Sequence, residues 1–206
     1  MTQSSLSLRT SVLPNCSTQF VKWCAEEFQW KDLSEDVIMD IGCGVEMNCC
    51  KAILTQFPDV RTLIAVNKES TVFEQAHFTD RRINSCVGNI LERDSLKIYE
   101  GKMNKIISAD TFHQIYDKEI AFRNVYRLLK PGGEVGFFFV VNSWVHKFLT
   151  ALSELPKYAD ILEGTRIQGN LPQKYVDPIV MASEWKLASG APRVRTSLVV
   201  GILLVL

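Results

Sequence analysis

The stretch VIMDIGCGVEMNCC, from Val37 to Cys50, decides the fold of this chain. Its first part, Val37 to Ile41, is apolar except for Asp40 and predicts a buried strand. Gly42 and Gly44 follow, and beyond them apolar residues recur at helical spacing. A strand, a glycine-rich turn and a helix in this order form the first crossover of a nucleotide-binding α/β sheet. Glycines let a ligand approach the backbone closely, and the helix N-terminus offers free N–H groups to ligand anions.

Composition excludes several classes of protein. At 206 residues the chain is expected to form one domain with a substantial core. Lysine plus arginine (23) balance aspartate plus glutamate (23), and no long basic run occurs, so nucleic-acid binding is not indicated. The N-terminus lacks the apolar core of a signal peptide. The apolar end, Leu198 to Leu206, is far shorter than the roughly 20 residues of a membrane-spanning helix, and we expect a buried strand or an irregular end there.

The cysteines indicate a reducing compartment rather than a metal site. None of them forms a C-x-x-C pair, and the chain has only three histidines, so no zinc site is expected. We expect free thiols packed as small apolar groups in a cytoplasmic protein. The six are Cys16, Cys24, Cys43, Cys49, Cys50 and Cys86.

Strand and helix patterns alternate along the chain, which predicts an α/β fold. The fold expected is a doubly wound, mostly parallel Rossmann-like sheet with helices on both faces. Strands are expected at Val37–Ile41, Thr62–Val66, Ile83–Val87, Lys105–Ser108 and Val135–Val141. A first helix is expected to begin with Asn15, Ser17 or Thr18 as its cap, and further helices are expected at about Val45–Phe57, Ser70–Ala76 and from Ser143 to Leu155. Another helix is expected after its cap Asp117, with an inner face formed by Ile120, Ala121, Val125, Leu128 and Leu129. Lys130–Gly133 is expected to form a turn. One domain would span residues 1–206, with its core at about 15–150, a loop-rich cap region at about 156–186 and an atypical tail at 187–206.

Polar residues stand where these strands end, and parallel strands end at one edge of the sheet. Asp40, Asn67, Asn89 and Ser108–Asp110 are therefore expected to converge on one cleft. A dinucleotide fingerprint requires a third glycine or alanine, and Met47 occupies that position. A nicotinamide-dependent oxidoreductase is consequently the third-ranked function.

Three features together resemble a class I S-adenosylmethionine-dependent methyltransferase: the D-I-G-C-G turn, the polar residue after the second strand and the L-L-K-P-G-G-E turn. Three further segments, NKIISADTFHQIYD, AFRNVYRLLKPGGEVGFFFV and SELPKYADIL, are similar to the arthropod juvenile hormone acid methyltransferase group. Members of that group methylate the carboxylate of farnesoic acid or related isoprenoid acids. The resemblance covers about Asn15 to Val141 and extends weakly to about Trp185.

The resemblance implies S-adenosylmethionine as the cofactor and a small apolar acid as the acceptor. It places the methionine end of the cofactor at Asp40, Gly42, Cys43 and Gly44 and along Ser108, Ala109 and Asp110. It places the ribose at Asn67, with Lys68 flanking the adenine, and the adenine amino group at Asn89, with Ile90 beside it. It places the acceptor near Gln19, His113 and Gln114, with His113 as the first candidate for orienting it. A carboxylate acceptor is ionised near pH 7, so in-line methyl transfer needs positioning and desolvation rather than a strong base.

The sequence departs from the family pattern at four positions: Glu46 replaces a glycine, Asn67 and Asn89 replace carboxylates, and Gln114 replaces a tryptophan. A Glu46 carboxylate about 4 Å from the cofactor's own carboxylate would cost up to about 4 kcal/mol. These departures leave a second function open, a catalytically impaired binding protein with the methyltransferase fold. The family fold continues into an antiparallel edge hairpin, which we expect to be incomplete in this chain.

Overall fold

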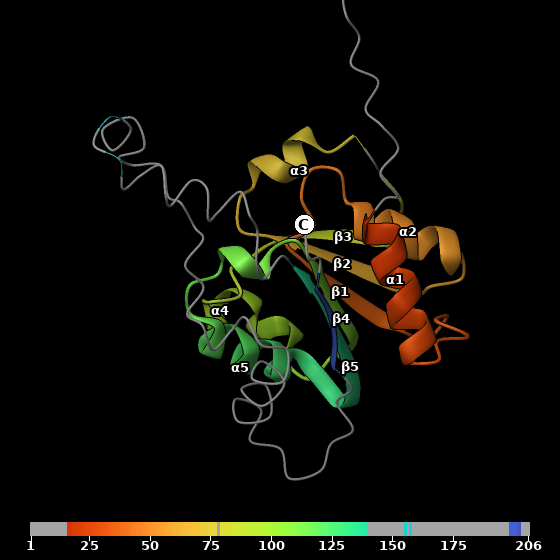
Figure 1. Cartoon of the computed structure of the whole chain (residues 1–206). Helices are drawn as coiled ribbons and strands as arrows, with labels where there is room; N and C mark the ends of the chain where they lie inside the picture. The colour runs from red at the N-terminus through yellow and green to blue at the C-terminus, as the bar shows by residue number, and fades with distance from the viewer. Residues whose placement is uncertain (1–15, 78, 140–154, 156, 158–197, 203–206) are drawn as a thin grey trace, which may run out of the picture.

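The computed structural model describes residues 16–77, 79–139, 155, 157 and 198–202. They contain a six-stranded sheet in the order β3-β2-β1-β4-β5-β6, and every neighbouring pair of strands is parallel (Figure 1). The strands are β1 (Val37–Ile41), β2 (Thr62–Asn67), β3 (Ile83–Val87), β4 (Met103–Ala109), β5 (Leu129–Phe139) and β6 (Leu198–Ile202). The predicted parallel, Rossmann-like sheet is confirmed.

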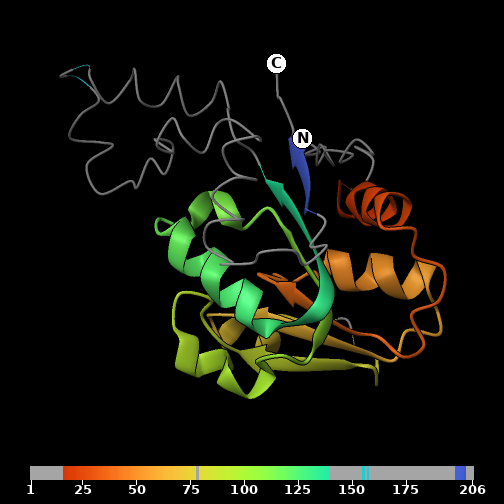
Figure 2. The ribbon, with the colours of Figure 1, turned by 90° about the horizontal axis from the view of Figure 1, so that it is seen from below.

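Helices cover both faces of the sheet, so the fold is doubly wound (Figure 2). Helices α1 (Cys16–Glu27), α2 (Asn48–Gln56) and α3 (Thr71–Gln75) lie on one face, and α4 (Arg93–Leu96) and α5 (Lys118–Leu128) lie on the other. Two short 3-10 helices, η1 (Lys97–Tyr99) and η2 (Phe112–Gln114), complete the described part. Each face buries its own apolar cluster, one under α1 and α2 and the other under α5.

A glycine in β5 allows α1 to pack closely on the sheet. A Cβ at Gly136 would lie 2.6 Å from Sγ of Cys24 and 3.2 Å from Cζ of Phe20, both in α1. Such a distance is too short for a side chain, so this position admits only glycine without movement of the helix. The close packing holds the first turn of α1 beside the carboxyl-terminal edge of the sheet.

Helix α2 begins at Asn48, later than the predicted start at Val45. The delay arises because Met47 takes the left-handed conformation, with φ of 48°, and this conformation interrupts a helix. The residues from Gly44 to Met47 therefore form a turn between β1 and α2. This longer turn forms part of the site described below.

Asp117 caps α5 as predicted, because its Oδ1 accepts a hydrogen bond of 2.9 Å from the N–H of Ile120. The predicted inner face was wrong at one position: Ile120 is 39% exposed, whereas Phe122 is buried and stacks on Phe112. The buried positions follow the helical period from Lys118 through Ala121, Phe122, Val125 and Leu128. Ser17 and Thr18 lie inside α1 rather than at a cap.

The predicted turn at Lys130–Gly133 lies within β5, which runs from Leu129 to Phe139 with a register shift opposite Met103 and Lys105. Gly132 has φ of +79°, so the glycine allows the irregularity without ending the strand. The sheet then continues with β6, paired in parallel from Val135–Leu198 to Phe139–Ile202. Within the described residues the C-terminal edge of the sheet is this one parallel strand, and the edge hairpin that we expect to be incomplete stays a prediction.

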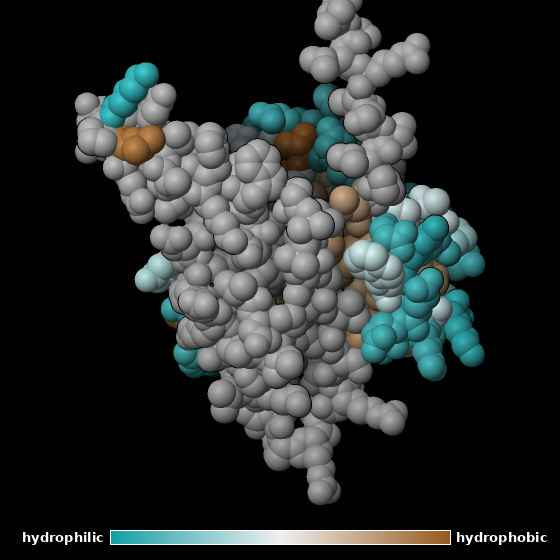
Figure 3. Space-filling model, in the orientation of Figure 1, coloured by the Kyte–Doolittle hydropathy of each residue, from teal (hydrophilic) through white to brown (hydrophobic). Residues whose placement is uncertain are grey.

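The predicted helix from Ser143 and the cap region at 156–186 lie outside the described residues, apart from residues 155 and 157. Hydrophilic side chains cover the outer side of α1, where Lys22, Glu26 and Glu27 are exposed (Figure 3). No helix in the described part of the chain is long and apolar enough to cross a membrane.

Candidate functional site

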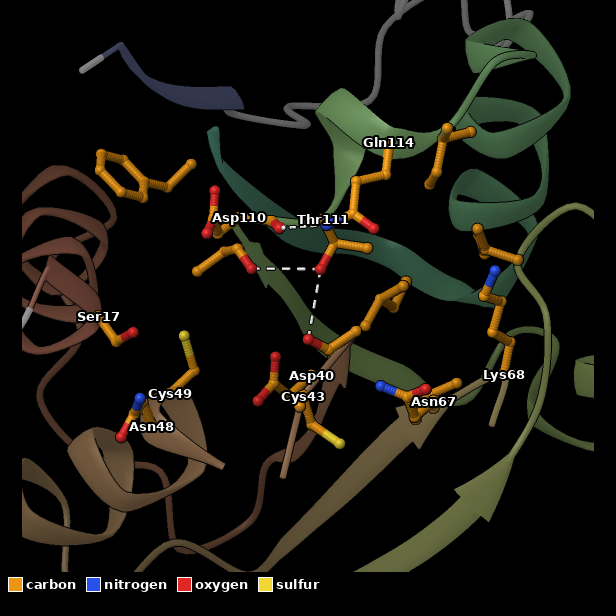
Figure 4. Close-up of a pocket in the computed structure, with 18 of the residues that line it drawn as sticks. Ser17, Asp40, Cys43, Asn48, Cys49, Asn67, Lys68, Asp110, Thr111 and Gln114 are labelled. Atoms are coloured by element: carbon orange, nitrogen blue, oxygen red, sulfur yellow. Dashed lines mark hydrogen bonds between the residues drawn. The ribbon is translucent and has the colours of Figure 1, made fainter. Parts of the chain in front are cut away.

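A cavity of about 770 Å³ opens at the carboxyl ends of β1, β2 and β4 (Figure 4). Eleven of the fourteen residues proposed from the sequence line it, so the expected convergence of the strand ends is observed. These eleven are Asp40, Gly42, Cys43, Gly44, Asn67, Lys68, Asn89, Ile90, Ala109, Asp110 and Gln114. The other three are Ser108, Gln19 and His113.

The turn after β1 is held by hydrogen bonds from its first two residues. The N–H groups of Gly42 and Cys43 donate to the carbonyl oxygen of Val66 over 2.8 and 3.1 Å. The next N–H groups, of Gly44, Val45 and Glu46, donate to no other described residue, and all three residues line the cavity. These unpaired donors, close to the N-terminus of α2, form a site suited to an anion.

The two glycines of the turn have different roles, although both have positive φ, of 78° and 64°. A Cβ at Gly42 would overlap the side chain of Thr111, so this glycine is required for packing. A Cβ at Gly44 would meet no atom within 4 Å, so this glycine leaves its space to the cavity. Gly44 is thus the point where a ligand can approach the backbone most closely.

Asp40 ends β1 beneath the cavity and is only 1% exposed. Its Oδ2 accepts a hydrogen bond of 3.3 Å from Sγ of Cys50. Burial raises the pKa of Asp40 to about 7, and hydrogen bonds from the thiol and the backbone N–H of Cys50 oppose this rise. No lysine, arginine or histidine among the described residues offsets the burial, so the carboxylate is suited to a ligand cation.

Asn67, the last residue of β2, and Lys68, the first residue of the loop after it, both line the cavity (Figure 4). Oδ1 of Asn67 accepts a hydrogen bond of 3.0 Å from the N–H of Glu69, which leaves its Nδ2 as the group directed to a ligand. Lys68 is exposed, and its Nζ lies 3.8 Å from Oε1 of Glu69. At the position predicted to bind the ribose hydroxyls, Asn67 therefore offers Nδ2 as a donor, and its acceptor Oδ1 is shared with the N–H of Glu69.

The side chain of Asn89 stabilises its own loop. Its Oδ1 accepts from the N–H of Leu91 over 3.1 Å, and its Nδ2 donates to Oε1 of Glu92 over 2.9 Å. The N–H of Ile90, next to it, donates to no other described residue. At this strand end the backbone of Ile90, rather than the Asn89 amide, has the free hydrogen-bonding group.

The loop after β4 closes the cavity opposite the glycine turn. Asp110 has a left-handed backbone with φ of 56°, and its N–H donates to the carbonyl oxygen of Phe138 over 2.6 Å. Thr111 Oγ1 lies 3.3 Å from the carbonyl oxygen of Gly42, which ties this loop to the turn (Figure 4). Ser108 is buried, donates to the carbonyl oxygen of Ile41 over 2.7 Å and does not line the cavity.

The three residues assigned to the acceptor lie in different places. Gln114 lines the cavity, with Nε2 at 3.5 Å from the carbonyl oxygen of Asp110. Gln19 is half-buried in α1 and is not part of the cavity lining. His113 belongs to η2, but its side chain lies outside the described part of the structure.

Glu46 lies at the cavity rim with its side chain 71% exposed, and Oε2 is 3.4 Å from Nζ of Lys51. Its backbone does not take the left-handed conformation, which falls on Met47 instead. A glycine is therefore not required at position 46 for the turn to form. The ion pair with Lys51 and exposure to solvent both weaken the repulsion expected between Glu46 and a ligand carboxylate.

Several residues of the cavity lining were not predicted from the sequence. Helix α1 contributes Cys16 and Ser17, and Thr111 follows directly after the predicted Asp110. Thr111 and Phe138 lie close to strand ends, and this proximity could have predicted them as lining residues. No local pattern in the sequence places α1 beside the cavity. No group of three or more histidine, cysteine, aspartate or glutamate side chains within the described residues is arranged to hold a metal ion.

A comparison with protein families matches residues 32–180 to a family described as a methyltransferase domain. The chain belongs to this family. The match includes β1 with its glycine turn and all the strand ends that line the cavity. No curated protein matches the sequence.

Solved structures support the same fold for this methyltransferase domain. Phosphoethanolamine N-methyltransferase 2 of Haemonchus contortus, in complex with S-adenosyl-L-methionine, superposes with a TM-score of 0.58 at 16% identity, over 84% of this chain and 36% of that one. A protein of Methanococcus maripaludis assigned to the S-adenosyl-L-methionine-dependent methyltransferases has a TM-score of 0.54 at 20% identity, over 82% and 76% of the two chains. The chain spans about half the length of several other solved methyltransferases that it matches.

Proposed function

We propose that this chain binds S-adenosylmethionine in the cavity beside Gly44 and transfers its methyl group to a small molecule. The observation that carries the proposal is the pairing, in one cavity, of a buried carboxylate and a row of backbone N–H groups, which find no cationic partner and no acceptor, respectively, among the described residues. S-adenosylmethionine supplies an electrophilic methyl group on a sulfonium, next to an ammonium and a carboxylate.

The amino-acid end of the cofactor fits the turn after β1. Asp40 would hold the ammonium, and the N–H groups of Gly44, Val45 and Glu46 would hold the carboxylate. Each hydrogen bond to a charged group contributes about 1.5–3 kcal/mol in proteins. The open space above Gly44 admits the ligand at this point.

The adenosine end fits the edge formed by β2 and β3. Asn67 would contact the ribose hydroxyls through Nδ2, and Lys68 would flank the adenine. The free N–H of Ile90 is available to a ring nitrogen, and the apolar side chains of Ile90 and Leu91 line the same part of the cavity. Hydrogen bonds of Asn67 are weaker than those of a carboxylate, because charge-assisted bonds are roughly twice as strong.

For the acceptor we propose an apolar carboxylic acid, as in the juvenile hormone acid methyltransferase group that the sequence resembles. Phe138 and Ile115 provide apolar lining, and Gln114 provides a neutral donor. His113, next to Gln114 in η2, is the residue we propose for orienting the acceptor. An ionised carboxylate needs no strong base, so alignment and exclusion of water would be the work of these residues.

A second function, a non-catalytic binding protein with this fold, is favoured by Asn67 and Asn89, which replace carboxylates, and by the Asn89 amide, whose two groups both bond within its own loop. A screen for methyl transfer from radiolabelled S-adenosylmethionine to a panel of isoprenoid and fatty acids separates the two. Turnover with any acid eliminates the binding protein, and cofactor binding without turnover supports it.

Calorimetry with the full chain tests the cofactor itself. We expect S-adenosylmethionine and its demethylated product to bind with one site per chain. Absence of binding at millimolar concentration would contradict both functions based on this cofactor. Six free thiols are typical of a reducing compartment, so we propose the cytoplasm as the location.

A further inference from the structure

The contact between Cys50 and Asp40 joins the helix that follows the glycine turn to the carboxylate beneath the cavity. Cys50 lies in the first turn of α2, and its thiol donates to Oδ2 of Asp40 over 3.3 Å. Both side chains are buried. A thiol is a weak donor, and the backbone N–H of Cys50 also stabilises the ionised carboxylate, but burial outweighs both hydrogen bonds.

The other groups around Asp40 do not supply a positive charge. Its partners on the neighbouring strands are Ala65 in β2 and Ile107 in β4, and neither can be charged. The titratable groups facing it are the thiols of Cys43 in the turn and Cys49 in α2, together with Cys50. Within the described residues, Asp40 is therefore surrounded by thiols, apolar side chains and the backbone N–H of Cys50, with no cation among them.

Burial leaves Asp40 able to exchange its proton near neutral pH, since its pKa is raised to about 7. Burial also raises the pKa of Cys50 well above its ordinary value, so the thiol keeps its proton and remains a donor over the whole neutral range. The hydrogen bond favours the ionised carboxylate and lowers the pKa of Asp40. Without it, the carboxyl would keep its proton to a higher pH.

We propose that Cys50 is a positioning residue that tunes the protonation of Asp40, so that binding of a ligand ammonium group releases a proton from this carboxyl. The proposal rests on the proposed cofactor, whose amino-acid end carries that ammonium group. When the ammonium binds, the carboxylate is stabilised in its ionised form and the proton leaves to the buffer. The affinity then rises with pH below about 7, by up to tenfold per pH unit, and levels off above it.

The test compares two ligands that differ at the amino-acid end. S-adenosylhomocysteine carries the ammonium and carboxylate, whereas 5′-methylthioadenosine keeps the adenosine and thioether but lacks both. Their binding to the full chain is measured by calorimetry at pH 6, 7 and 8, in two buffers with different ionisation enthalpies, which gives the number of protons released. We expect proton release at pH 6 to 7 with S-adenosylhomocysteine and none with 5′-methylthioadenosine.

Variants assign the effect to this pair of residues. Asp40→Asn should abolish the pH-dependent part of S-adenosylhomocysteine binding. Cys50→Ala removes the thiol donor and keeps the backbone N–H of residue 50, so the midpoint of proton release should move to higher pH, while Cys50→Ser keeps a side-chain donor and should not show this rise. A merely structural role for Cys50 would change affinity or stability without moving the midpoint.

Several outcomes would overturn the proposal. They are the same proton release with both ligands, an unchanged pH profile in Asp40→Asn, and the same midpoint in Cys50→Ala as in the native chain. If Cys50→Ala does not fold, carbon NMR of the Asp40 carboxyl in the native chain measures its titration directly, and a midpoint below pH 5 also overturns it. Absence of binding by either ligand to the folded chain at all three pH values contradicts the proposed cofactor instead.

Discussion

Thr111 Oγ1 lies 3.3 Å from the carbonyl oxygen of Gly42 and so joins the loop after β4 to the turn after β1. The same hydroxyl lies 3.2 Å from the carbonyl oxygen of Ala109, in its own loop. The contact is close enough that a Cβ at Gly42 would overlap Thr111. The two segments, which both line the cavity, are therefore in direct contact.

Gly42→Ala and Gly44→Ala should separate packing from binding. Both impose positive φ on alanine, at a cost of about 1–2 kcal/mol. Gly42→Ala also overlaps Thr111, which should raise the total loss to about 3–4 kcal/mol. Gly44→Ala meets no atom and should instead weaken S-adenosylhomocysteine binding. Urea denaturation and calorimetry measure the two effects, and equal losses of stability in both variants would argue against this division.

Asp40→Asn should change how stability depends on pH. The folded chain holds the Asp40 proton up to about pH 7, whereas the unfolded chain loses it near 3.8. The free energy of unfolding should therefore fall as pH rises from 4 to 7, by about 4 kcal/mol from this group. Asparagine carries no charge, so the variant should gain stability relative to the native chain between pH 4 and pH 8. Parallel denaturation curves for the two proteins across this range would be inconsistent with a buried, uncompensated carboxylate.

Glu46→Gly should have only a small effect on cofactor affinity. The side chain is exposed and paired with Lys51, and exposed ion pairs contribute about 0–1 kcal/mol. We expect a change in Kd for S-adenosylmethionine of less than about fivefold, with Glu46→Gln as the control that removes charge and keeps size. A gain of a hundredfold in Glu46→Gly would show that the carboxylate blocks the site after all.

Asn67→Asp should strengthen cofactor binding. One carboxylate oxygen can keep the hydrogen bond from the N–H of Glu69 while the other accepts from a ribose hydroxyl. Charge-assisted bonds are roughly twice as strong as neutral ones, so a gain of about tenfold in affinity is expected. Asn89→Asp is a matched control, because its amide already bonds within its loop and the new charge would face Glu92. An equal gain in both variants would indicate a general charge effect instead of a ribose contact.

Much of the fold could be predicted from the sequence, because strand and helix periods are local. The bounds of β3 were predicted without error, and the cap at Asp117 followed from its position before an apolar helical stripe. The start of α2 was wrong because the left-handed conformation of Met47 depends on how the turn packs. The parallel placement of β6 depends on pairing with β5, a contact between residues far apart in the chain.

The site was predictable where it lies at strand ends and less so elsewhere. Asp40, Asn67 and Asp110 lie at or next to the carboxyl ends of parallel strands, so topology alone brings them together. Ser17 reaches the cavity because α1 packs against Gly136 of β5, a contact that no short motif predicts. The directions of side chains could not be predicted from the sequence either. Ser108 donates to the carbonyl oxygen of Ile41, and Glu46 contacts Lys51.

The most direct test of the central claim is calorimetric titration of the full chain with S-adenosylmethionine at pH 8, where Asp40 is ionised. We expect one site per chain, with competition by S-adenosylhomocysteine and weaker binding in Gly44→Ala. A folded protein that shows no heat of binding at millimolar cofactor would contradict it.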